Sequence, residues 1–341
     1  MSTAAAELAP SGVYLRACLA PFAQVLSRPD VTDIYVNRPG ELWVETLGGS
    51  TERHDNSDIT ELTLARLSRQ IAALTHQGVS REHPLLAATL PDGSRIQIVA
   101  PPATRGPLAL AIRRQVAASL TLQDYAAGDH FAETRTNPGR SGEDEELCRL
   151  INQRNFVEAL SLAVRARKNI VVAGGTSTGK TTFLNALLRE IPADERLIFI
   201  EDTPELIVDH ENWVGLVSVR GELGEAKVTA NDLVSASLRM RPDRIILGEL
   251  RGPEAFAFLR AVNTGHPGSM TTIHADSPRS AIEQLVMLVL QGATRLSRDD
   301  VRHYVRESLD VFVQLSRSGG RRSVEAVVLR GAIQSADSSN A

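Results

Sequence analysis

The segment Ile170-Val171-Val172-Ala173-Gly174-Gly175-Thr176-Ser177-Thr178-Gly179-Lys180-Thr181-Thr182 decides the fold of one half of this chain. Its first four residues are apolar and predict a buried strand, and residues 181–190 after the glycines predict a helix. The glycines allow successive backbone N–H groups to turn toward phosphate oxygens, and the helix N-terminus adds the positive end of its dipole. The spacing Gly174-x-x-x-x-Gly179-Lys180-Thr181 therefore predicts a phosphate-binding loop between a strand and a helix.

This loop assigns roles to individual residues. Lys180 is expected to reach the β- and γ-phosphates of ATP, and the Thr181 hydroxyl is expected to ligate Mg²⁺. ATP and Mg²⁺ are therefore the predicted ligands. The residues predicted to bind the nucleotide are Gly174, Gly175, Thr176, Ser177, Thr178, Gly179, Lys180, Thr181 and Thr182. A chance glycine-rich turn is the alternative, and the strand and helix on either side argue against it.

A second apolar run ends in a carboxylate, Ile245-Ile246-Leu247-Gly248-Glu249. A carboxylate at the end of such a strand can orient the attacking water or hold Mg²⁺ through a water molecule. Glu249 is therefore predicted as the catalytic base and as a water-mediated Mg²⁺ ligand. The alternative is a surface carboxylate at the end of a strand.

Acidic residues follow a third apolar run at 197–200, in the sequence Glu201-Asp202-Thr203-Pro204-Glu205. Ligands of open α/β sheets lie at the carboxyl ends of the strands, which would place these carboxylates near Mg²⁺ and the γ-phosphate. Asp202 could instead cap a helix with Glu205 at its third position. Both interpretations stay open for Asp202 and Glu205, whereas a role in hydrolysis is favoured for Glu201.

A glycine-flanked segment, Gly265-His266-Pro267-Gly268-Ser269-Met270-Thr271-Thr272-Ile273-His274-Ala275, runs into a predicted strand. A histidine beside a γ-phosphate can report whether that phosphate is present. A structural histidine is the alternative. The clustering of His, Thr and Gly in this segment favours a functional His274.

Length and composition limit the classes of protein that this chain can belong to. With 341 residues and 43% hydrophobic residues, it is long enough for about two globular domains. Its net charge of -4 argues against a protein that stably holds nucleic acid. Two isolated cysteines, Cys18 and Cys148, exclude a cysteine-rich zinc site and suggest a reducing compartment. No signal peptide and no apolar run of about 18 residues is seen, so a cytoplasmic protein is expected.

The order of predicted elements gives the domain organisation. A smaller α+β domain is expected over 12–115, with helices at 13–26 and 60–77 and strands at 34–36, 42–45, 95–99 and 108–113. A polar, acidic linker is expected over 116–147, long enough to allow large relative movement of the two domains. An α/β domain of the RecA-like P-loop class, with a parallel sheet covered by helices on both faces, is expected over 148–331. It ends in a hairpin at 311–316 and 324–329, and residues 1–11 and 332–341 are expected to be disordered.

The four motifs, in this order along the chain, resemble the secretion-ATPase superfamily, where they are the Walker A motif, acidic box, Walker B motif and histidine box. The resemblance covers residues 174–275. In the N-terminal half, Leu90-Pro91-Asp92-Gly93-Ser94-Arg95-Ile96-Gln97, Pro101-Pro102 and Ile112-Arg113-Arg114 resemble the VirB-eleven type of type IV secretion. Type II secretion ATPases usually carry a four-cysteine zinc element, which this chain cannot build, and pilus motors lack the Pro-Pro stretch. Leu120-Thr121-Leu122-Gln123-Asp124-Tyr125 and the linker after it resemble the long-linker branch.

This resemblance implies a ring-shaped homo-hexamer with nucleotide bound between the N- and C-terminal domains. It places arginines of the N-terminal domain at the phosphates, here Arg95 and Arg113, with Arg114 as the alternative to Arg113. Arg105 and Arg114 are expected more as surface charges. Arg251 is expected either to fix the acidic cluster or to face a neighbouring subunit.

The resemblance also implies a function, which is ATP hydrolysis that powers a type IV secretion or conjugation apparatus. The implied partners are inner-membrane components of that apparatus, including other ATPases. The implied location is the cytoplasmic face of the inner membrane, with peripheral membrane association possible and no stable nucleic-acid binding. The alternatives are a pilus or type II secretion motor, a DNA helicase or packaging ATPase, and a nucleotide-gated scaffold with little turnover.

Overall fold

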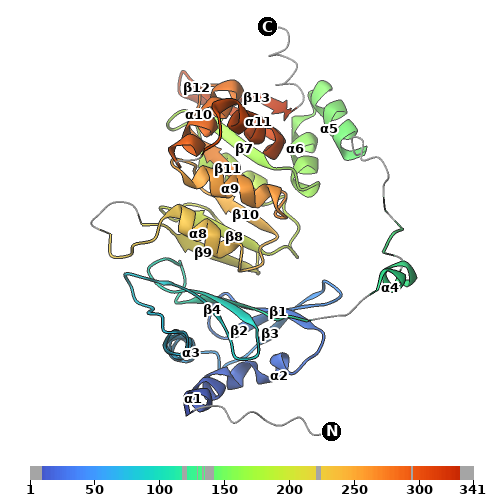
Figure 1. Ribbon diagram of the computed structural model, residues 1–341. Helices are drawn as coiled ribbons and strands as arrows, with labels where there is room; N and C mark the ends of the chain where they lie inside the picture. The colour runs from blue at the N-terminus through green and yellow to red at the C-terminus, as the bar shows by residue number, and fades with distance from the viewer. Residues whose placement is uncertain are drawn as a thin grey trace.

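Two units, each built on its own sheet, make up the computed structural model (Figure 1). The structure describes residues 10–116, 121–128, 130–132, 134, 142–219, 224–292 and 295–330. The N-terminal unit, in blue and teal, lies against one edge of the C-terminal unit, and α4 (Leu122–Ala127) lies to one side of both (Figure 1). Within the described residues, no helix is both long enough and apolar enough to cross a membrane.

The N-terminal unit is a six-stranded antiparallel sheet in the order β3-β2-β1-β6-β5-β4. Its strands are β1 (Val31–Val36), β2 (Glu41–Thr46), β3 (Thr51–Asp55), β4 (Leu85–Thr89), β5 (Arg95–Val99) and β6 (Ala109–Arg113). Its helices are α1 (Pro10–Leu19), η1 (Ala20–Phe22), α2 (Ala23–Leu26) and α3 (Glu61–Leu74). Thr60 caps α3 by accepting from the Thr63 N–H, and Leu64, Leu67 and Ile71 of α3 are fully buried, as their helical spacing predicts.

The C-terminal unit is a seven-stranded sheet in the order β13-β12-β7-β11-β10-β8-β9. Every neighbouring pair is parallel except β12 and β13, which form the predicted hairpin. The strands are β7 (Ile170–Gly174), β8 (Leu197–Glu201), β9 (Trp213–Val217), β10 (Arg244–Leu247), β11 (Met270–Ile273), β12 (Val311–Ser318) and β13 (Arg321–Leu329). The helices are α5 (Gly142–Asn152), α6 (Phe156–Arg165), α7 (Lys180–Leu188), α8 (Ala230–Ser237), α9 (Glu254–Asn263), α10 (Pro278–Gln291) and α11 (Arg298–Ser308).

Both faces of this second sheet are buried. Successive residues of β7 point to opposite faces, so Val171 and Ala173 belong to one hydrophobic cluster while Ile170 and Val172 belong to another. Residues of α8, α9, α10 and α11 complete the first cluster, and residues of α5, α6 and α7 complete the second. Helices therefore cover both faces, which confirms the predicted fold class of a RecA-like domain after an α+β domain.

The segment 116–147, predicted as a polar, turn-rich and acidic linker, contains α4 (Leu122–Ala127) and the first half of α5. Residues 117–120, 129, 133 and 135–141 of it lie outside the described residues. The acidic run 143–146 occupies the first turns of α5, where the positive end of the helix dipole stabilises carboxylates. Leu147, which follows this run, packs into the core of the C-terminal unit. Residues of 142–147, before the predicted boundary at 148, thus pack with that unit. Of the tails expected to be disordered, 1–9 and 332–341 lie outside the described residues, whereas Pro10 and Ser11 belong to α1.

The two units meet through polar groups as well as apolar ones. Arg196 is buried, with its guanidinium 4.1 Å from the centre of the Tyr35 ring and Nη1 donating to Asn37 Oδ1 at 2.7 Å. Arg241 of the C-terminal unit forms an ion pair of 2.7 Å with Glu45 of the N-terminal unit. An interface of this kind, rich in directional contacts, fixes the orientation of one unit on the other.

Replacement of Arg244 by alanine is expected to destabilise the C-terminal unit by about 3–5 kcal/mol, because it breaks a buried ion pair. Arg244 is fully buried, and it donates from Nε and Nη2 to the two oxygens of Glu195 at 2.6 and 2.8 Å. Without it, the counter-charge that buried Glu195 keeps among the described residues is the partly exposed Arg167. Chemical denaturation followed by circular dichroism measures the loss. The matched control is Arg165→Ala, which removes an exposed ion pair to Glu190 and should change stability by less than about 1 kcal/mol.

Candidate active site

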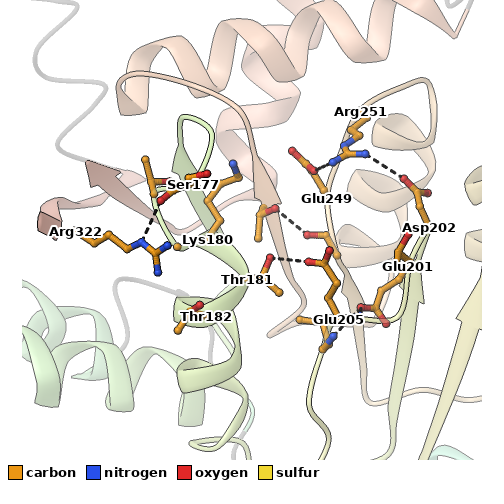
Figure 2. Close-up of a pocket in the computed structure, with 16 residues that line it drawn as sticks. Ser177, Lys180, Thr181, Thr182, Glu201, Asp202, Glu205, Glu249, Arg251 and Arg322 are labelled. Atoms are coloured by element: carbon orange, nitrogen blue, oxygen red, sulfur yellow. Dashed lines mark hydrogen bonds and ion pairs between the residues drawn. The ribbon is translucent and has the colours of Figure 1, made fainter. Parts of the chain in front are cut away.

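The four predicted motifs all contribute to one pocket at the carboxyl ends of neighbouring parallel strands, but the fourth does so through Thr272, and His274 is not one of the lining residues. The phosphate loop follows β7, the acidic box follows β8, Glu249 follows β10 and His274 follows β11. Figure 2 shows Lys180, Glu205 and Glu249, which come from the first three of these loops, around a common space. The pocket is lined by Ser177, Thr178, Gly179, Lys180, Thr181, Thr182, Glu201, Asp202, Thr203, Glu205, Leu206, Gly248, Glu249, Arg251, Thr272 and Arg322. Ligands of open α/β sheets bind at this edge.

The phosphate loop has the backbone geometry that its glycines predict. Gly179 has a φ of +94°, in the left-handed region that favours glycine, and α7 begins at the next residue. Lys180 is buried, and its ammonium donates to the carbonyl oxygens of Gly174 and Gly175 at 3.0 and 3.2 Å. Burial lowers the pKa of Lys180. A bound phosphate would offer this partly desolvated cation a stronger acceptor than two neutral carbonyls.

His274 lies between the lysine of the loop and the predicted catalytic base. Its Nε2 is 2.8 Å from a carboxylate oxygen of Glu249, and Lys180 Nζ is 3.4 and 3.5 Å from its two ring nitrogens. Because the lysine can only donate, the imidazole accepts from Lys180. The approach of Nε2 to Glu249 Oε1 is a close polar contact without hydrogen-bond geometry. Such a histidine links the position of Lys180 to that of Glu249.

Arg251 fixes the acidic cluster, which was one of its two predicted roles. It forms an ion pair with Glu249 and another, of 3.5 Å, with Asp202 (Figure 2). The Glu249 carboxylate, with 15% of its side chain exposed, is therefore held between a histidine and an arginine. These two contacts hold the Glu249 carboxylate in one position at the pocket.

Glu201 stabilises the loop 201–206 that follows β8, which we call the acidic loop. It is buried, and its Oε1 accepts hydrogen bonds from the backbone N–H groups of Glu205 and Leu206 at 2.8 and 2.9 Å. Its other oxygen forms an ion pair with Arg105 of the N-terminal unit. No helix starts at Asp202, so the capping interpretation was wrong. Glu205 instead accepts from the Thr181 hydroxyl at 3.3 Å (Figure 2).

Arg95 and Arg113 lie away from the phosphate loop of their own chain. They face each other across β5 and β6 and line a second pocket together with Arg239 at the end of α8. Neither lines the pocket of the four motifs. Arg114 instead donates to the backbone carbonyl of Val31 at 3.3 Å, so Arg113 is the one of the two that shares a pocket with Arg95.

Two arginines for which the sequence predicted no role in the site lie in or next to it. Arg322 of β13 lines the pocket and donates from Nε to the Ser177 carbonyl at 3.1 Å (Figure 2). Arg105, expected as a surface charge, is largely buried with 16% of its side chain exposed. No local pattern distinguishes either residue from other arginines, because their partners lie far away along the chain.

The residues of this pocket fit a hard divalent cation such as Mg²⁺. Thr181, Glu205 and Glu249 present only oxygen donors toward it. In the part of the chain that the structure describes, no group of three or more His, Cys, Asp or Glu residues forms a metal cage. Mg²⁺ at a nucleotide site is held by one or two protein oxygens and by the phosphates, so it needs no such cage.

Comparison with known proteins identifies the family. The family of type II/IV secretion system proteins matches residues 147–322, which include all four motifs. The type IV secretion system protein VirB11 of Bartonella henselae is 36% identical over 324 residues, covering 91% of each chain. The chain belongs to the VirB11 family of type IV secretion ATPases.

Other VirB11-type proteins support the same assignment. VirB11 of Brucella suis is 38% identical over 304 residues and covers 87% of this chain and 84% of its own. PtlH of Bordetella pertussis, a type IV secretion system protein, is 38% identical over 312 residues and covers 89% and 90%. The crystal structure of the Brucella suis VirB11 ATPase, in complex with sulphate, superposes with a TM-score of 0.87 at 36% identity, covering 93% of this chain and 97% of that one. The type IV secretion assignment, rather than a pilus or type II motor, is thus confirmed.

Proposed function

We propose that this chain is a Mg²⁺-dependent ATPase that assembles as a homo-hexameric ring at the cytoplasmic face of the inner membrane. In this proposal it works with other components of a type IV secretion apparatus, including other ATPases. The observation that carries the chemistry is the convergence of Lys180, Thr181 and Glu249 in one pocket. Membership of the VirB11 family supports the part of the proposal that concerns the type IV secretion apparatus.

The proposed reaction begins with exchange of partners at the phosphate loop. Lys180 leaves the carbonyls of Gly174 and Gly175 for the β- and γ-phosphates, and the loop N–H groups bind the remaining oxygens. Thr181 would hold Mg²⁺ directly, and Glu249 would hold it through water. The metal would neutralise charge on the phosphates. Movement of Lys180 also changes the contact with His274, which reports nucleotide binding to Glu249.

Glu249 takes the proton from the attacking water in this proposal. Its contacts with His274 and Arg251 orient it toward the pocket. Glu201 supports the reaction by holding the loop that carries Asp202 and Glu205. Charge that develops on the γ-phosphate needs further cations, and Arg95 and Arg113 are the proposed source.

Those two arginines would act on a neighbouring subunit. Their pocket is separate from the phosphate-loop pocket of the same chain. In a ring, head-to-tail contacts repeat until they close, so a pocket on one chain can complete the site of the next. The nucleotide would then lie between the N-terminal unit of one subunit and the C-terminal unit of another.

The direct test is steady-state ATP hydrolysis by the purified full-length chain, with and without excess EDTA, beside Lys180→Ala. We expect turnover that EDTA abolishes and that Lys180→Ala lowers at least about 100-fold, because the loop loses its only lysine contact to the phosphates. Mass in solution, measured with and without nucleotide, should reach that of six chains. Absence of wild-type turnover under all conditions would favour a nucleotide-gated scaffold instead.

A further inference from the structure

A short segment of the N-terminal unit extends the edge of the ATPase sheet. The Val217 N–H donates to the Ala103 carbonyl at 2.9 Å, and the Arg105 N–H donates to the Gly215 carbonyl at 2.8 Å. Thr104 forms an antiparallel bridge with Leu216, and its hydroxyl also donates to the Gly215 carbonyl at 3.2 Å. Residues 103–105 therefore act as an added strand on β9, the outermost strand of that sheet.

This docking inserts Arg105 beneath the acidic loop. Its Nη1 donates to the Leu206 carbonyl at 3.1 Å, and its Nη2 forms the ion pair with Glu201. The guanidinium lies 5.8 Å from the centre of the Trp213 ring, and 16% of the side chain is exposed. One side chain of the N-terminal unit thus holds both ends of the loop 201–206.

Side chains within that loop reach the reacting part of the pocket. Glu205 accepts from Thr181 of the phosphate loop, and Asp202 pairs with Arg251, which also pairs with Glu249. A shift of the loop therefore moves the partners of both the predicted Mg²⁺ ligand and the predicted base. Loss of Arg105 would also leave the buried Glu201 carboxylate without its counter-charge, which favours such a shift.

We propose that Arg105 is a positioning residue, through which docking of residues 103–105 on β9 sets the acidic loop for hydrolysis in the same chain. This inference rests on the proposed ATPase function. If Arg105 has this role, the contact between the two units regulates the rate of ATP hydrolysis, because hydrolysis is fast only while residues 103–105 are docked on β9. Arg105 itself touches neither the phosphate loop nor the proposed nucleotide position, so nucleotide affinity should not depend on it.

Two variants remove the contact in different ways. Arg105→Ala deletes the guanidinium, whereas Gly215→Ala keeps it and places a Cβ 2.5 Å from the Arg105 Cδ, which expels the side chain. Both should lower kcat about 10- to 100-fold, the effect of a misplaced site, with ATP affinity changed less than about twofold. Arg105→Lys, which keeps the charge, should restore part of the loss.

The matched control is Arg81→Ala. It removes an exposed ion pair between the two units, Arg81 with Glu225, where Nη2 and Oε2 are 2.7 Å apart, and leaves the acidic loop untouched. We expect its kcat to equal that of the wild type. An equal loss in Arg81→Ala would overturn the proposal, because general adhesion between the units would then explain the effect.

Hydrogen exchange on the nucleotide-free protein provides a readout that does not need activity. The amides of Glu205 and Leu206 are bonded to Glu201, so Arg105→Ala and Gly215→Ala should speed their exchange, and Arg81→Ala should not. Unchanged exchange at these two amides overturns the inference even if kcat falls. If the wild type does not hydrolyse ATP, the proposed function fails, and the exchange experiment still decides the role of Arg105.

A double-mutant cycle completes the test. In a Glu201→Gln background, Arg105→Ala should cost little further activity, because the residue through which it acts has lost its charge. The same fold-loss of kcat in both backgrounds would show that Arg105 acts elsewhere, and the proposal would be wrong.

Discussion

Replacement of Glu249 by glutamine should lower ATP hydrolysis by about 10²- to 10⁴-fold, which is the contribution of a general base. The amide keeps the shape of the side chain and its place between His274 and Arg251 but cannot accept the proton of the attacking water. The phosphate loop is unchanged, so ATP should bind at least as tightly as to the wild type. Affinity should even rise slightly, because one negative charge near the phosphates is lost.

Single-turnover hydrolysis and equilibrium binding of a fluorescent ATP analogue separate these two effects. Lys180→Ala should lose binding and hydrolysis together, whereas Glu249→Gln should lose hydrolysis alone. A matched carboxylate change on the exposed face of α6, Glu158→Gln, should behave as the wild type. If Glu249→Gln retains turnover, the base is another carboxylate of the pocket, and Glu205→Gln, at the residue bonded to Thr181, is the next variant to test.

Local signals in the sequence were sufficient to predict the C-terminal fold and the meeting of Lys180, Glu201 and Glu249 in one pocket. The continuous apolar runs of β7, β8 and β10 are long enough to form strands buried on both faces, and the residues that follow each run define its loop. Because parallel strands end at one edge, the order of motifs along the chain already places Lys180, Glu201 and Glu249 near each other. Residues at the ends of such strands can therefore be predicted to lie together without knowing how the helices pack on the sheet.

Contacts across the fold could not be predicted in the same way. Arg322 lies 145 residues from Ser177, and Thr104 lies 111 residues from Gly215. Their positions depend on how the hairpin β12–β13 and the N-terminal unit pack on the ATPase sheet, and no periodicity records that packing. The strand β3 was missed for a different reason, since its sequence TERHD is polar and half exposed at the edge of its sheet.

The start of the C-terminal unit shows a conflict between composition and packing. The acidic run before Leu147 resembles a linker, because such residues are typical of solvated segments. In α5 they instead form the exposed first turn of an amphipathic helix, with Asp144 paired to Lys168 at 2.6 Å and Leu147 and Leu150 buried. The acidic residues outnumber the few buried apolar ones in α5, so the composition of this segment did not indicate a helix that packs on the core.

Arg95→Ala and Arg113→Ala should each reduce hydrolysis, and the double variant should approach the loss of about 10³-fold that follows removal of a transition-state arginine. The reason is that these guanidinium groups face one shared pocket, where they would neutralise phosphate charge in a neighbouring subunit. Arg69→Ala on the exposed side of α3 is the matched control and should keep full activity. Nucleotide binding and ring mass of each variant should be measured alongside, because loss of the ring would also stop turnover.

Subunit mixing decides whether the arginines act within or between chains. Rings formed from equal amounts of the double arginine variant and Lys180→Ala contain two kinds of chain, each inactive by itself. If the arginines act in trans, about a quarter of head-to-tail interfaces in a random ring combine an intact phosphate loop with intact arginines, so activity reappears. If they act within one chain, no subunit in the mixture has a complete site and activity stays absent. Recovery on mixing would therefore place the nucleotide between subunits, and its absence would require the N-terminal unit to swing onto its own phosphate loop during the cycle.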